Sequence, residues 1–162
     1  MEDLMPNSGR SDVRTVRHSQ MLAILLVAGT LACGNPGSPS NWSRSHGLLI
    51  PSLSSIQTIA VPSHVRVGES FAVTVNSMGS STCVRGDGMD VSRRGDVVDL
   101  VPWDVVAPTG SVCTDDLRPY PHQTEITPQA AGTVTLRAHG LVMSDGGGRS
   151  LGTVIAVVTV TP

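Results

Sequence analysis

The segment GTVTLRAHG, residues 132–140, carries the pattern that decides the fold of this chain. Val134, Leu136 and Ala138 alternate with polar or charged neighbours, which is the period of a β-strand with one buried face. The last segment, GTVIAVVTVTP at residues 152–162, is almost continuously apolar and predicts a strand buried on both faces. The C-terminal part of the chain therefore predicts strands rather than helices.

The same strand signals recur along the chain from about residue 48 onward. Gly and Pro are frequent, at 17 and 11 residues, and no window of the folded part shows a convincing helical period. Short runs of β-branched residues bounded by turn formers lie at 56–62, 64–77, 96–107 and 122–127. About seven such strands predict an all-β fold, a single antiparallel β-sandwich over residues 55–162.

The order of these features resembles that of bacterial immunoglobulin-like domains. VPSHVRVGESFAVTV (61–75) is similar to their opening pair of strands, and PQAAGTVTLRAHG (128–140) to the late strand that precedes the final one. The resemblance covers residues 56–162 and rests on pattern rather than on an invariant motif. It implies a stalk, adhesion module or binding domain, and only rarely a catalyst. Fold by itself does not imply function.

The first third of the chain has the features of an export signal. Arg10, Arg14 and Arg17 precede an uncharged apolar run at residues 21–32. That run is too short to cross a hydrocarbon core as a mature helix, which needs about 20 residues. It has the length of the apolar region of a secretory signal peptide. We therefore expect residues 1–32 to be a signal peptide that is removed.

The end of this signal, LLVAGTLAC at residues 25–33, resembles the lipobox of bacterial lipoprotein signal peptides. Thr30 stands where that family usually has Leu. The resemblance implies that Cys33 is lipidated on its sulfur and becomes the mature N-terminus after cleavage behind Ala32. It also implies the bacterial cell envelope, with the outer membrane or periplasmic face favoured because Gly34 is no inner-membrane retention signal. A plain signal peptide with an incidental Cys33, and an uncleaved anchor, are the alternatives.

Residues 33–54 are expected to hold the lipidated Cys33 and a disordered tether, because GNPGSPSNWSRSHG (34–47) is rich in Gly, Pro, Ser and Asn. The expected partners are the membrane, through at least two acyl chains, and an envelope protein. Nucleic acid is not expected, because the net charge is −2 and aromatic residues make up only 2% of the chain.

Two cysteines remain once Cys33 is assigned to lipid. Cys83 and Cys113 form an even pair in an exported protein, which predicts a disulfide. A closed loop of about 30 residues gains roughly 3–4 kcal/mol in the chain-entropy model. A redox or nucleophilic Cys is the alternative, but neither residue lies in a Cys-x-x-Cys motif or beside an obvious basic neighbour.

The chain contains one motif that suggests catalysis. GRSLG (148–152) matches the Gly-x-Ser-x-Gly elbow of serine hydrolases, which needs a following helix and then an acid and a His. The residues after this motif include no acid and no His, so Ser150 is expected to lead into the last strand. Since no nucleophile, base and orienting group are recognisable together, we predict no enzymatic activity and no cofactor.

CVRGDGMDVSRRGD, residues 83–96, contains Arg-Gly-Asp twice and is rich in Asp. Calcium takes six to eight oxygen ligands, but the spacing Asp-x-Asp-x-Asp-Gly is absent and Arg residues lie among the acids. Turn chemistry therefore explains the segment better than adhesion or a metal site. His64, His122 and His139 lack a zinc spacing and are expected at the surface.

The sequence therefore predicts an envelope-anchored lipoprotein with a structural or protein-interaction role. The alternative is a ligand- or calcium-binding β-sandwich module that uses the Cys83–Cys113 loop region.

Overall fold

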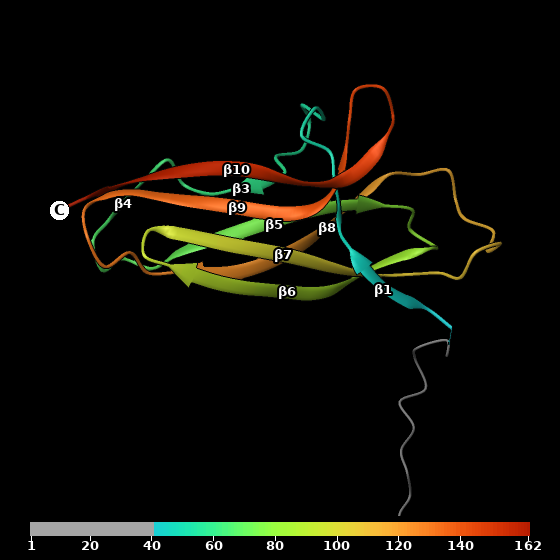
Figure 1. The fold of residues 1–162 in the computed structure, drawn as a ribbon, viewed down its shortest axis with the longest axis horizontal. Coiled ribbons are helices and arrows are strands. Elements are labelled where there is room, and N and C mark those ends of the chain that lie inside the picture. The colour runs from blue at the N-terminus through green and yellow to red at the C-terminus, as the bar shows by residue number, and fades with distance from the viewer. Residues whose placement is uncertain (1–40) are drawn as a thin grey trace, which may run out of the picture. The chain divides into compact units, whose positions relative to one another are not determined.

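A computed structural model describes residues 41–162 of the chain (Figure 1). The predicted lipidation site Cys33, the predicted signal peptide and the first part of the predicted tether lie outside these residues. The described part is all-β, and no helix occurs between residues 41 and 162. The strands are β1 (Ser43–His46), β2 (Leu48–Leu49), β3 (Ile59–Ala60), β4 (His64–Arg66), β5 (Phe71–Gly79), β6 (Val84–Arg94), β7 (Val97–Val106), β8 (Arg118–Ile126), β9 (Gly132–Met143) and β10 (Arg149–Thr161).

The strands form two sheets. The larger has the order β1-β7-β9-β10-β4, with β2 on β9 and β6 on β7, and the smaller has the order β3-β5-β8. Most pairs are antiparallel, but β7–β9, β2–β9 and β4–β10 are parallel, which an entirely antiparallel prediction missed. The pairing of β7 with β9 is parallel because β8, which lies between them in the sequence, belongs to the other sheet. The chain leaves the larger sheet, crosses to the smaller one and returns in its original direction.

Both sheets contribute to one hydrophobic core. The predicted alternation is confirmed in β9, where Val134, Leu136 and Ala138 are buried, and in β5, where Val73 and Val75 are buried. These side chains belong to one cluster that also includes residues of β7, β8 and β10. Aliphatic side chains therefore fill the space between the sheets, as the scarcity of aromatic residues requires.

The folded domain begins earlier than the predicted boundary at residue 55. β1 pairs with β7, with His46 opposite Trp103, and β2 places Leu48 opposite Leu141 of β9. Leu49 is completely buried in the core. The expectation of a tether was wrong over these strands. Ser, Arg and His in β1 give no hydrophobic period, because that strand draws its stability from pairing with β7.

The last strand differs from its prediction. β10 is not buried on both faces: Leu151, Ile155 and Val157 are exposed at 70%, 61% and 54%, whereas Val158 and Val160 are buried. One face of β10 packs on the core, and no second layer covers the other face within residues 41–162.

Candidate functional site

A disulfide joins Cys83 to Cys113, as the sequence predicts. The two Cα atoms lie 5.5 Å apart, within the usual range for a bridge. Cys83 is buried just before β6, and Cys113 is exposed in the segment between β7 and β8. The backbone N–H of Ala107 also donates to the carbonyl oxygen of Cys83 at 2.9 Å. The disulfide and this hydrogen bond together hold the long β7–β8 connection against the start of β6.

Asp116 organises the polar side of this connection. The hydroxyl of Thr114 and the backbone N–H of Ser81 donate to Asp116 Oδ1, and Arg118 Nε donates to Oδ2 at 2.8 Å. The hydrogen bonds from Thr114 and Ser81 hold the pKa of Asp116 well below its ordinary value. Asp116 therefore stays ionised and ties the turn after β5 to the segment that precedes β8.

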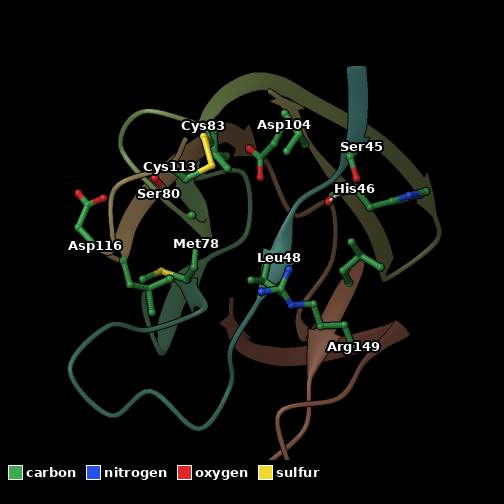
Figure 2. A pocket seen from close by; sticks show the side chains of 15 residues that line it. Ser45, His46, Leu48, Met78, Ser80, Cys83, Asp104, Cys113, Asp116 and Arg149 are labelled. Atoms are coloured by element: carbon green, nitrogen blue, oxygen red, sulfur yellow. Dashed lines mark hydrogen bonds between the residues drawn. A yellow bond between two sulfur atoms is a disulfide. The ribbon is translucent and has the colours of Figure 1, made fainter. Parts of the chain in front are cut away.

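A cavity of about 460 Å³ lies beside the disulfide (Figure 2). Figure 2 shows the disulfide, Ser80 and Asp104 along one side and Arg149 on the opposite side. The wall is apolar in part and also contains two acids, one Arg and one His. The residues that give the cavity its character are Leu48, Met78, Leu141, Asp104, Asp116 and Arg149. The cavity thus combines segments from the start, middle and end of the folded domain.

Asp104 connects this cavity to a buried polar network. Ser77, Asp104 and His122 are only 0%, 2% and 3% exposed. Ser77 Oγ donates to Asp104 Oδ1 at 3.0 Å, and His122 Nε2 lies 2.9 Å from Ser77 Oγ and 3.2 Å from Asp104 Oδ1. His122 Nδ1 lies 2.9 Å from the carbonyl oxygen of Gly88. Both ring nitrogens of His122 therefore have partners, as a buried imidazole requires.

The prediction of His122 as a surface residue was wrong. His122, Thr124 and Ile126 occupy every second position of β8 and therefore share one face of the strand. His122 and Ile126 are both buried, so this is the inward face. Ser77 likewise continues the inward series of Val73 and Val75 in β5. The same period of two that predicted the core could thus have identified these polar residues at inward positions.

The three residue types of this network also occur in serine hydrolases, but the geometry is different. In such a triad the acid bonds Nδ1 of the His and the Ser bonds Nε2. Here Ser77 and Asp104 both face Nε2 of His122, while Nδ1 faces a backbone carbonyl. Ser77 is also completely buried, so a substrate does not reach its hydroxyl. The network joins β5, β7 and β8 and acts as a polar tie between the two sheets.

A second polar cluster lies where β7, β9 and β10 are adjacent. Asp99 Oδ1 lies 2.9 Å from His139 Nε2, and Asp99 Oδ2 accepts from Arg94 Nη2 at 2.9 Å. His139 Nδ1 lies 2.9 Å from Thr153 Oγ1. The hydrogen bond with His139 and, to a smaller extent, the one from Arg94 lower the pKa of Asp99. These contacts link β6, β7, β9 and β10, four neighbouring strands of the larger sheet.

The two Arg-Gly-Asp tripeptides occupy different structures. The first lies in β6, where Asp87 pairs with Arg44 at 2.8 Å and Arg85 stacks 4.6 Å from the centre of the Trp42 ring. The second spans the turn between β6 and β7, where Gly95 has a φ of 61°. That positive φ favours Gly, in agreement with turn chemistry.

The acidic residues of this region are dispersed. Asp90 accepts a hydrogen bond from Trp103 Nε1 at 2.8 Å, whereas Asp87 pairs with Arg44. Across residues 41–162, no group of three or more His, Cys, Asp or Glu side chains is placed to hold a metal ion. The calcium version of the alternative function therefore has no preformed ligand set in the folded domain. Ser150 lies in β10 and not at a turn from a strand to a helix.

Within the described part of the chain, no helix is both long and apolar enough to span a membrane. Comparison with family models, curated proteins and solved structures finds no match to the chain.

Proposed function

We propose that this protein is an exported lipoprotein of a bacterial cell envelope, whose folded domain is a non-catalytic, immunoglobulin-like β-sandwich with a structural or protein-interaction role. The observation that carries the proposal is the disulfide between Cys83 and Cys113. Such bridges persist in oxidising compartments and are rare in the cytosol, so the bridge supports export. The signal-like segment before Cys33 supports the same destination.

The sandwich architecture is supported by the shared core. Val73 and Val75 of the smaller sheet and Leu100, Leu136 and Val158 of the larger sheet belong to one cluster. Two sheets that face one another over such a core are the arrangement of β-sandwiches. The chain also divides its early strands between the sheets, because β3 pairs with β5 whereas β4 pairs with β10.

The early start of the fold limits how far the domain stands from a lipid anchor. β1 begins at Ser43, about ten residues after Cys33. An extended chain spans at most about 3.3–3.6 Å per residue, so this linker reaches no more than roughly 35 Å. A domain attached at Cys33 would work close to the membrane surface.

The test of this proposal is metabolic labelling with radioactive palmitate in a bacterium that expresses the full chain. We expect label in the parent protein and none in Cys33→Ala. Cys113→Ala is the matched control and should keep the label. Label that persists in Cys33→Ala, or no label in the parent chain, would refute the lipid anchor.

The cavity beside the disulfide supports a second candidate function, binding of a small ligand. Its volume of about 460 Å³ lies within the range of small-molecule sites. Leu48, Met78 and Leu141 suit an apolar body, and the carboxylate of Asp104 suits an amine or another N–H donor. The expected ligand is therefore a compact apolar amine. Thermal denaturation with a simple alkylamine tests this candidate, because binding to the folded state raises the midpoint.

A further inference from the structure

Among residues 41–162, only a short strand pairs with the outer border of β10. On one side β10 pairs with β9 continuously, from Arg149 opposite Met143 to Val160 opposite Gly132. On its other side β4 pairs only with Thr159–Thr161. Figure 1 shows β10, in red, beyond β9 along one border of the larger sheet. We call residues 150–158 of this strand the β10 border.

The direction of the backbone groups at this border follows from the short contact with β4 and its flanks. Thr159 N donates to the carbonyl oxygen of Ser63 at 3.0 Å, and the carbonyl oxygen of Thr161 accepts from Val67 N at 2.9 Å. In an antiparallel pair, alternate residues direct both backbone groups to the same side. Four further residues therefore direct N–H and C=O groups to the open side, namely Leu151, Thr153, Ile155 and Val157. Within residues 41–162, no strand pairs with them there.

The side chains of the same residues are also uncovered. Leu151, Ile155 and Val157 are exposed and form an apolar row on the outer face of the sheet. The β10 border thus combines unpaired hydrogen-bonding groups with exposed aliphatic surface. Proteins normally protect such strands, because an open apolar edge is a template for pairing with another chain.

The other long borders in the folded domain carry that protection. β6 contains charged residues along its length, among them Arg85, Asp87 and Asp90. β8 contains Pro119 and Pro121, which cannot donate a backbone hydrogen bond. In contrast, the sequence from Ser150 to Thr161 contains no charged residue and no Pro.

We propose that the β10 border is a self-association surface, on which a second copy of this chain pairs antiparallel through its own β10 border. A two-fold axis brings each strand against itself, so a charge near the axis would face its own copy. The lack of charge over residues 150–158 removes this repulsion. A charged partner strand would gain no ion pair at this border.

The limits of the open segment define the register. Arg149 bounds it at one end, and β4 covers β10 from Thr159 at the other. Residues 150–158 are centred on Val154, which therefore lies on the two-fold axis. Leu151 then faces Val157 of the second copy, and Thr153 faces Ile155. All four belong to the set whose backbone groups point outward, so this register satisfies both hydrogen bonding and apolar contact.

The experiment is mass measurement by light scattering on the full chain in detergent, with the detergent contribution subtracted. The proposal predicts a dimer for the parent protein and for Val91→Lys, which makes the same change on exposed β6. It predicts that Val157→Lys weakens self-association by at least about tenfold, because each lysine replaces an apolar contact with Leu151 of the second copy and adds a charge to an uncharged strand pair. A monomeric parent, or equal masses for parent and Val157→Lys, overturns the proposal.

A second variant keeps the test valid if Val157→Lys does not fold. Thr153→Pro removes an N–H that points to the open border, so it removes no backbone hydrogen bond to β9. It does remove the side-chain hydrogen bond between Thr153 and His139 at the surface of the sheet. It is expected to give a folded monomer with its disulfide intact. Hydrogen exchange gives an independent readout: the amides of Leu151, Thr153, Ile155 and Val157 should exchange more slowly as the protein concentration rises. A folded dimer in Thr153→Pro, or exchange independent of concentration, contradicts the register.

Discussion

Ser77 Oγ lies 2.9 Å from His122 Nε2 in a part of the domain that solvent does not reach. Asp104, the third member of this network, comes from the larger sheet, whereas Ser77 and His122 come from the smaller. The hydrogen bond from Ser77 to Asp104 therefore links the two sheets through a largely aliphatic core. Asp104 also lines the cavity, so the network stabilises the wall of the candidate ligand site.

The first prediction concerns this network. His122→Ala is expected to lower the free energy of unfolding by about 3–5 kcal/mol, because it removes one of the two side-chain partners of the buried Asp104 carboxylate and leaves Ser77 as the other. His64→Ala is the matched control: His64 is exposed, and its loss should change stability by less than about 0.5 kcal/mol. Urea denaturation measures both. Equal effects of the two substitutions would show that the network adds nothing to stability.

The second prediction concerns the disulfide. Reduction is expected to lower the free energy of unfolding by roughly 3–4 kcal/mol, since the bridge closes a loop of about 30 residues. The double variant Cys83→Ser with Cys113→Ser should unfold at the same urea concentration with or without reductant. Cys33→Ser serves as the control and should keep the full response. A parent chain insensitive to reductant would mean that the bridge does not stabilise the domain.

The third prediction is a pH dependence set by Asp116. Hydrogen bonds from Thr114 and Ser81 lower the pKa of its carboxyl in the folded state. A carboxylate with a depressed pKa contributes stability above its unfolded pKa and loses it as the pH falls through the folded value. Stability should therefore decline as the pH falls below about 4, and Asp116→Asn should make this decline shallower.

Asp115→Asn is the control for this pH dependence, because the neighbouring Asp115 is exposed and the described part of the chain shows no side-chain hydrogen bond to it. Its profile should follow that of the parent chain. Indistinguishable profiles for the Asp116→Asn and parent chains, measured by urea denaturation between pH 2 and 7, would rule out this role of Asp116.

Some of these features were predictable from the sequence and others were not. Alternation in β5 and β9 identified the core because a half-buried strand must repeat with a period of two. The even pair of cysteines identified the disulfide. The exposed face of β10 could not be predicted, since a continuous apolar run does not say whether a second layer covers it. The parallel pairing of β7 with β9 also depends on the route of the chain between sheets, which no local pattern records.

The candidate site was harder to predict than the core. The sequence pointed to the region between Cys83 and Cys113, and both residues do line the cavity. The cavity is also lined by Leu48 and Arg149, which are far from Cys83 and Cys113 in the sequence. Leu48 lay within residues 33–54, which were assigned to the tether, and strand pairing with β9 decides its true position.

The fourth prediction tests the candidate ligand site. Hexylamine at millimolar concentration is expected to raise the thermal midpoint, whereas hexanoate is not, because the buried carboxylate of Asp104 favours a cation. Leu117→Trp, which places a larger side chain at the cavity wall, should abolish the shift. Val112→Trp, at an exposed position outside the wall, should retain it. Equal shifts with the amine and the acid would refute the predicted ligand class.

The central claim is that the chain is exported, cut before Cys33 and lipidated there. Mass spectrometry of the N-terminal peptide, from the full chain expressed in a bacterium and recovered from its membranes, tests this most directly. We expect a peptide that begins at Cys33 and carries acyl chains. A peptide that begins at Met1 or Met5, or an N-terminal Cys33 without lipid, would contradict it.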